Sequence, residues 1–162
     1  MRWIWFDRFT EFDSGRRAVA VKNVTLAEDH LHDHFPGFPI MPASLMIEGM
    51  AQTAGILVGE SRNFEEKVIL AKVKRAIFHE IVRPGETIRY EADIEHITEA
   101  AASTVGKAFV SERLVGEIDI VFSHIDQNMS GLNFPKENFV FTPEFRNLLS
   151  MYRNDVDQRV ML

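Results

Sequence analysis

Two side chains with acid–base chemistry stand in one proline-rich stretch, HFPGFPIMPASLMIEGMAQ, which runs from His34 to Gln52. Imidazole is the usual general base near neutral pH, so His34 is a candidate to abstract a proton. Glu48 is a lone carboxylate in an apolar segment, and apolar surroundings favour the neutral acid, which is a suitable proton donor. With backbone N–H groups at a helix start to receive an oxyanion, this pair is suited to proton abstraction next to a carbonyl.

Each polar residue of this stretch also has a structural interpretation. Glu48 can be a boundary residue that reaches solvent or a backbone amide. Gln52 lies one helical turn further on and either orients the carboxyl of Glu48 or is a hydrogen-bonded core amide. His30, His32 and His34 alternate, which on an extended strand would put three metal ligands on one face. We expect no metal site, because no further ligand is spaced to complete one.

A rigid turn followed by a helix must position these residues. Pro36, Pro39 and Pro42 fix φ and keep the residues before them out of the helical region. Pro42 is suited to the first position of a helix and Gly59 to a helix stop, so we predict a helix from Pro42 to Gly59. Apolar residues cover nearly every face of this segment, which indicates a central helix surrounded by protein.

Alternating apolar residues predict strands on both sides of this helix. Residues 3–25 are expected to form a hairpin with its turn at Asp13-Ser14-Gly15, followed by an irregular or one-turn helical link over residues 26–33. A turn is expected at residues 83–86, where the sequence is Arg-Pro-Gly-Glu. The strands predicted after the helix span residues 68–79, 87–97, 103–111 and 114–123. One buried helix with an antiparallel sheet wrapped on it is an α+β domain.

The C-terminal part is predicted to be a linker and a short helix. Residues 126–138 are polar and contain Ser-Gly and Pro. Thr142 and Pro143 then offer an N-cap and a first-position proline. The apolar residues that follow at helical spacing are Phe145, Leu148, Leu149 and Tyr152.

Composition excludes several classes of protein. The 162 residues provide for one domain with a single core, and the net charge of -6 argues against a nucleic-acid footprint over the whole surface. Lys72, Lys74 and Arg75 form a small basic cluster, which is either a solvated face or a site for an acidic partner. The absence of cysteine excludes a disulfide framework. Prolines and Glu48 interrupt the longest apolar tract, so we expect no membrane insertion and a cytoplasmic protein.

The stretch resembles the 3-hydroxyacyl-[acyl-carrier-protein] dehydratases of fatty-acid synthesis, which have the hot-dog fold, a long helix wrapped by an antiparallel sheet. The family's HFPG-x-P-hydrophobic-MPG-x-L block is similar to this sequence over residues 34–42, and its E-x-[ML]-A-Q helix is similar to residues 48–52. Looser similarity continues to about Ser123. The resemblance implies a hot-dog dehydratase-like domain over residues 1–125. Residues 126–162 have no counterpart in the family, and we expect them to be a linker and an amphipathic helix packed on the same domain.

The resemblance also implies a reaction. A (3R)-3-hydroxyacyl thioester, carried on acyl carrier protein or coenzyme A, is dehydrated to the trans-2-enoyl thioester in fatty-acid or related lipid synthesis. His34 removes the α-proton, Glu48 positions or protonates the departing hydroxyl, and the amide near Ala43 polarises the thioester carbonyl. No cofactor is implied. The substrate-binding residues expected are Phe35, Gly37, Met41, Ala43, Ser44 and Gln52.

Members of this family pair across a homodimer, or a trimer of dimers. The resemblance therefore implies that His34 of one chain meets Glu48 of the other, with an apolar acyl tunnel at the interface. Two departures stand at the helix start: Ala43 replaces the family's Gly, and Ser44 replaces an apolar residue or Cys. Two alternatives stay open. A hot-dog acyl thioesterase is a second enzyme with this fold, and a non-catalytic module that binds acyl thioesters or acyl carriers is suggested by the two departures and the extra C-terminal helix.

Overall fold

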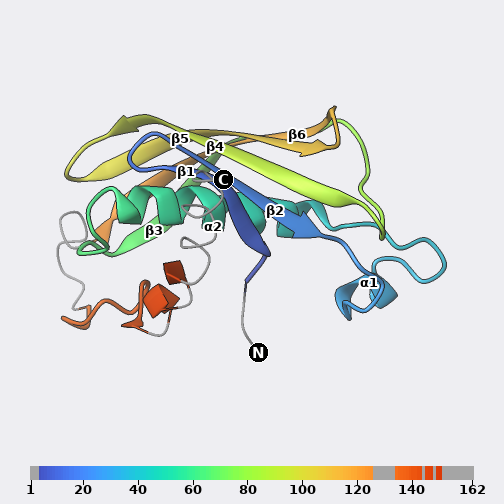
Figure 1. Ribbon diagram of the computed structural model, residues 1–162, viewed down its shortest axis with the longest axis horizontal. Coiled ribbons are helices and arrows are strands. Elements are labelled where there is room, and N and C mark those ends of the chain that lie inside the picture. The colour runs from blue at the N-terminus through green and yellow to red at the C-terminus, as the bar shows by residue number, and fades with distance from the viewer. Residues whose placement is uncertain (1–3, 126–133, 144, 148, 151–162) are drawn as a thin grey trace, which may run out of the picture.

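A six-stranded antiparallel sheet lies over one long helix in this protein, of which we analyse a computed structural model (Figure 1). The structure describes residues 4–125, 134–143, 145–147 and 149–150. Among the described residues, the helices with complete bounds are α1 (His30–Asp33) and α2 (Ala43–Glu60), and residues 143, 145–147 and 149–150 are also helical. The strands are β1 (Arg8–Asp13), β2 (Arg17–Asn23), β3 (Val68–Phe78), β4 (Thr87–Ile97), β5 (Ala101–Val110) and β6 (Arg113–His124), in the sheet order β1-β2-β4-β5-β6-β3.

The predicted turns join the strands at the points where the alternation of apolar and polar residues ends. β1 and β2 form the expected hairpin, closed by a hydrogen bond from the Arg16 N–H to the Asp13 carbonyl. The expected turn before β4 is also present: Glu86 N–H donates to the Arg83 carbonyl, and Gly85 has a φ of 93° that favours glycine. The α+β architecture predicted from the sequence is thereby confirmed.

Helix α2 begins and ends one residue later than the sequence predicted. Pro42 is the N-cap, with an extended ψ of 132°, and its carbonyl accepts from the N–H groups of Leu45 and Met46. The stop predicted at Gly59 is wrong, because the helix continues to Glu60. Gly59 serves close packing instead: a Cβ there would lie 2.5 Å from the ring of Phe141.

Most of α2 is buried, as its apolar sequence predicts. Leu57 and Met50 have no solvent exposure, and Tyr90 on β4 is equally buried beneath the helix. The helix passes close to that ring at Gly49, where a Cβ would lie 2.7 Å from the Tyr90 hydroxyl oxygen. The absence of a side chain at Gly49 therefore lets this part of α2 pack directly against the Tyr90 ring of the sheet.

The described part of the C-terminal segment packs at the end of α2. Thr142 caps the predicted helix: its Oγ1 accepts from the Phe145 N–H at 3.3 Å. Asn138 Nδ2 donates to the Phe64 carbonyl at 3.0 Å, and Arg146 Nη2 donates to the same carbonyl at 2.5 Å. These bonds tie the segment to the loop that follows α2.

Some predictions for this region fall on residues outside those described. Leu148, Tyr152 and residues 126–133 of the predicted linker are among them. In the part of the chain that the structure describes, no helix has the length and apolar character to span a bilayer.

Candidate active site

His34 directly follows α1 and is held by the far end of its own loop. Its Nδ1 lies 3.0 Å from the Ile40 carbonyl oxygen, and its own carbonyl accepts from the Ile40 N–H at 2.9 Å. Because a carbonyl only accepts, Nδ1 is the donor in this hydrogen bond, and in the neutral imidazole Nε2 is then the nitrogen without a proton. Nε2 is therefore the atom of His34 that can act as a base.

The loop after His34 is the rigid turn that the prolines predict. The Phe35 and Phe38 backbones exchange two hydrogen bonds, of 3.1 and 2.9 Å, around Gly37, whose φ of 77° favours glycine. The Phe35 ring stacks on the His34 imidazole with 4.4 Å between ring centroids. Phe35 and Phe38 are each about half exposed, and the Arg83 guanidinium lies over the Phe38 ring. The base thus sits beside an apolar surface that is open to a ligand.

The first turn of α2 presents amide donors next to this loop. Met41 is buried and donates its N–H to the Val82 carbonyl at 2.8 Å, which fixes the chain as it enters the helix. Ala43 and Ser44 follow, and both are exposed. Amides in the first turn have no partner within the helix and carry the positive end of its dipole. An anionic oxygen is favoured at this position.

Glu48 is half-buried one turn further along α2. Gln52 Nε2 donates to Glu48 Oε1 at 2.8 Å, and Gln52 Oε1 accepts from the Trp5 N–H at 2.8 Å. The structure therefore joins Gln52 both to Glu48 and to the N-terminal segment. These two interpretations of Gln52, an orienting residue and a hydrogen-bonded amide, are not exclusive.

The predicted residues thus fall into two groups within one chain. His34, Phe35 and Gly37 lie in the loop before α2, and the others lie at its start or along its first turns. His34 bonds to Ile40 and Glu48 bonds to Gln52. The structure describes one chain, so it does not test the expected meeting of His34 and Glu48 between chains.

The three alternating histidines have three different environments. His32 Nε2 lies 2.8 Å from the Leu26 carbonyl, and the His30 ring packs edge-on against Trp5 at 5.1 Å. Burial lowers the pKa of His30, which favours its neutral form. The segment is helical rather than extended, which is why alternation does not place the rings on one face. Within the described ranges, no three His, Asp or Glu side chains gather as metal ligands.

Sequence reasoning did not find two groups that support the site. One is the Trp5 amide, because a main-chain donor has no signature in a sequence. The other is a buried ion pair in which Lys22 Nζ lies 2.6 Å from Glu28 Oε1. Glu28 also accepts from the Thr25 N–H and so fixes the link that leads to α1. The available signal in the sequence was Lys22 itself, which follows Ala18 and Ala20 at alternate positions and so shares their face of the strand.

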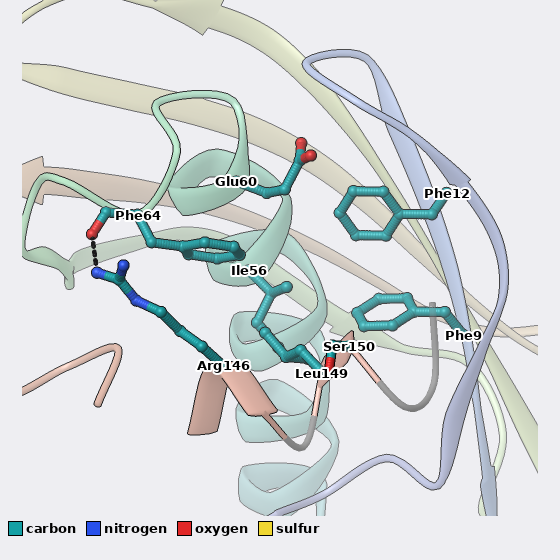
Figure 2. A pocket seen from close by; sticks show the side chains of 8 residues that line it. All are labelled: Phe9, Phe12, Ile56, Glu60, Phe64, Arg146, Leu149 and Ser150. Atoms are coloured by element: carbon teal, nitrogen blue, oxygen red, sulfur yellow. Dashed lines mark hydrogen bonds between the residues drawn. The ribbon is translucent and has the colours of Figure 1, made fainter. Parts of the chain in front are cut away.

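A separate cavity of about 140 Å³ lies at the other end of α2 (Figure 2). Figure 2 shows the rings of Phe9 and Phe12 facing Ile56 and Leu149, with Arg146 bonded to the Phe64 carbonyl. The lining residues are Phe9, Phe12, Ile56, Glu60, Phe64, Arg146, Leu149 and Ser150. No residue predicted for the site lines this cavity.

Comparison with solved structures supports the fold. The chain superposes on the dehydratase heterocomplex ApeI:P from Xenorhabdus doucetiae with a TM-score of 0.63 and 13% identity, over 75% of this chain and 82% of that chain. It superposes on the conserved protein PA5202 from Pseudomonas aeruginosa with a TM-score of 0.60 and 16% identity, over 72% and 86% of the two chains. These similarities bear on the fold alone, and the hot-dog architecture is confirmed.

Sequence comparison identifies the family. Residues 3–121 match the model of the FabA-like domain. The chain is 40% identical to the 3-hydroxyacyl-[acyl-carrier-protein] dehydratase FabZ of Koribacter versatilis, over 70% of this chain and 74% of that protein. It is 38% identical to the enzyme of the same name from Fusobacterium nucleatum, over 72% and 82% of the two chains. The chain therefore belongs to the 3-hydroxyacyl-[acyl-carrier-protein] dehydratase family, within the FabA-like domains.

Proposed function

We propose that this protein dehydrates a (3R)-3-hydroxyacyl thioester, carried on acyl carrier protein, to the trans-2-enoyl thioester in fatty-acid or related lipid synthesis. The observation that carries the proposal is the fixed state of His34. Its Nδ1 is bonded to a carbonyl, so Nε2 is a base, and this residue stands in a chain whose relatives bear the dehydratase name. Glu48, held by Gln52, supplies the acid.

Each step of the reaction uses a group described above. His34 Nε2 takes the α-proton while negative charge develops on the thioester oxygen. The amides of Ala43 and Ser44, at the positive end of α2, stabilise that oxygen. Glu48 gives its proton to the 3-hydroxyl, the Cβ–O bond breaks, and water leaves as the double bond forms.

The two alternatives receive less support. The relatives at 32% to 40% identity carry the dehydratase name, which does not favour a thioesterase. A non-catalytic binding module was suggested by Ala43 and Ser44. Both residues keep the backbone N–H that the reaction needs, so these substitutions do not remove the oxyanion donors.

We infer that the working form is a homodimer. Strand β3 is at the edge of the sheet and is largely exposed, with Leu70 41% and Ile77 40% exposed. The open edge of a sheet is a template for pairing with a second chain. Pairing there supports a site in which His34 of one chain faces Glu48 of the other, beside an acyl tunnel. A trimer of dimers and a cytoplasmic location stay predictions.

We also propose that acyl carrier protein delivers the substrate. The basic cluster of Lys72, Lys74 and Arg75 is not assigned as its docking site. Arg75 pairs with Glu117 at 2.9 Å, and Lys74 lies 3.8 Å from Glu95. Acidic neighbours thus balance two of the three basic side chains. Coenzyme A thioesters are the second class of substrate to test.

The decisive experiment is to follow enoyl-thioester formation by the wild type, His34→Ala and Glu48→Gln. We expect turnover by the wild type and a fall of kcat by about 100-fold or more in each variant, because acid–base catalysis contributes that much. His32→Ala is the matched control, since His32 is an exposed neighbour bonded only to the Leu26 carbonyl among its described contacts.

Other outcomes would reject the proposal. A wild type that forms no enoyl product, or variants as active as the wild type, would contradict it. Thiol release from a saturated acyl thioester without enoyl product would indicate the thioesterase. Tight binding of acyl carrier protein without turnover would indicate the binding module.

A further inference from the structure

The cavity at the far end of α2 is lined by two parts of the chain. Strand β1 contributes Phe9 and Phe12, and α2 contributes Ile56. Leu149 belongs to the C-terminal segment, which lies beyond the part of the chain that matches the FabA-like model. The family domain therefore forms only part of this lining, and the additional segment completes it (Figure 2).

Aromatic and aliphatic side chains make up most of the lining. The Phe9 and Phe12 rings pack edge to face, with 5.0 Å between their centroids. Ile56 and Leu149 are both buried, and Figure 2 shows them facing these two rings. A bound water needs several polar partners, which such side chains do not offer. The cavity therefore favours an apolar occupant over water.

The two charged residues of the lining are engaged with other groups of the protein. Glu60 Oε2 accepts from the Ser14 hydroxyl at 2.5 Å. The Arg146 guanidinium donates through Nε to the Phe141 carbonyl at 3.1 Å, and through Nη2 to the Phe64 carbonyl at 2.5 Å. One carboxylate and one guanidinium also balance each other in formal charge. The lining therefore favours a neutral ligand over an anion or a cation.

The volume of the cavity indicates the size of that ligand. The cavity measures about 140 Å³. An engineered cavity of about 150 Å³ in another protein, lined by leucine, isoleucine and phenylalanine, stays dry and binds benzene. The similar volume and the similar lining indicate an apolar group about as large as benzene.

We propose that this cavity is a second binding site, separate from the candidate active site, for a neutral apolar group about as large as benzene. An aromatic ring or a branched alkyl group has this chemistry. The ligand would contact both the family domain and the C-terminal segment. Its binding therefore stabilises the packing of the segment on the domain by mass action. The proposal does not depend on the reaction that the protein catalyses.

Benzene is the probe for this site in the full-length protein. We expect saturable binding with a Kd of about 1 mM or below, and a melting temperature that rises with benzene concentration. The methyl NMR signals of Ile56 and Leu149 should shift, because an aromatic ring changes the shielding of methyl groups beside it. Those of Leu45 and Ile47, on the part of α2 that carries Glu48, should stay unchanged. This comparison distinguishes the cavity from the candidate active site.

Variants with a filled or an enlarged cavity test the location of the bound benzene. Ile56→Phe places a ring in the cavity, so we expect it to weaken benzene binding by about tenfold or more. Ile81→Phe is the matched control, because Ile81 is 48% exposed and does not line the cavity. Its affinity for benzene should stay within about twofold of the wild type.

A second variant keeps the test valid if Ile56→Phe does not fold. Phe12 is only partly buried, and Phe12→Ala removes its ring from the lining. The enlarged cavity should bind naphthalene about tenfold more tightly than the wild-type cavity does.

The opposite results would overturn the proposal. If the Ile56 and Leu149 signals did not move near the solubility limit of benzene, the cavity would take no apolar ligand, because it is too narrow or because another part of the chain fills it. Equal benzene affinity in the wild type and Ile56→Phe would place the binding elsewhere, as would unchanged naphthalene affinity in Phe12→Ala. Shifts confined to Leu45 and Ile47 would place benzene at the candidate active site.

Discussion

The imidazole of His34 and the carboxyl of Glu48 each take part in a hydrogen bond that orients the side chain. Ile40 holds Nδ1 of the first, and Gln52 holds Oε1 of the second. The sequence predicted the two residue types, because a lone carboxylate in an apolar helix is unusual and a histidine before a rigid turn is well oriented. It could not predict how the two side chains are held, since the Ile40 carbonyl and the Trp5 amide belong to the main chain.

A glycine beside Glu48 gives a prediction at the same scale. We expect Gly49→Ala to lower the free energy of unfolding by about 1 to 3 kcal/mol, because the new methyl would meet the buried Tyr90 ring at 2.7 Å. Urea denaturation measures this change. Gly55→Ala is the matched control on α2: its Cβ would lie 3.2 Å from Phe122, and alanine favours the helix, so its effect should stay within about 1 kcal/mol. Equal losses in both variants would contradict the explanation.

At the scale of elements, the periodicity of apolar residues predicts where helices and strands form but not which strands are neighbours in the sheet. Strand β4 was predicted with its observed limits, and β3, β5 and β6 differ from the prediction by one or two residues at their ends. The hairpin expected over residues 3–25 has shorter strands, Arg8–Asp13 and Arg17–Asn23. The order of the sheet was not predicted, because alternation tells which face of a strand is buried and not which strand is its neighbour. The helix stop at Gly59 failed because glycine has two uses, the left-handed turn and close packing, and the sequence does not distinguish them.

An ionic network between β2 and β4 predicts a dependence of stability on pH. Burial opposes ionisation of Glu91, but hydrogen bonds from Arg17 and Arg89, at 2.9 and 2.8 Å, outweigh it and lower the pKa of Glu91. A folded-state pKa below the unfolded value stabilises the fold above that unfolded value, and the contribution is lost as pH falls through the folded pKa. Glu91→Gln should therefore cost about 1 kcal/mol at pH 7 and progressively less below pH 4.5.

Thermal or urea unfolding of Glu91→Gln and the wild type between pH 3 and pH 7 would test this. Glu112→Gln is the control, because Glu112 is 95% exposed and lies 3.9 Å from Arg89. A difference between Glu91→Gln and the wild type that stays constant over this range would contradict the assignment.

At the scale of the whole molecule, the proposed dimer makes the site a shared property of two chains. If His34 and Glu48 meet across the interface, a mixed dimer of His34→Ala and Glu48→Gln contains one site with both native residues. Random mixing makes half of the dimers mixed, with one of two sites intact, so about a quarter of wild-type activity should return. Co-expression with two affinity tags and an enoyl-thioester assay measures it. No recovery in verified mixed dimers would place both residues of each site in one chain.

Gly59 and Phe141 make the body of the protein and its C-terminal segment dependent on each other. An interior helical glycine costs about 1 kcal/mol relative to alanine, and here that cost accompanies the space that the Phe141 ring fills. In a relative without the segment, a Cβ at this position would meet only the Phe64 ring, at 3.2 Å, among the contacts described here. A relative that has the segment can accept alanine at 59 only with a smaller side chain at 141. The two positions are therefore expected to vary together in evolution, although 82 residues separate them in the sequence.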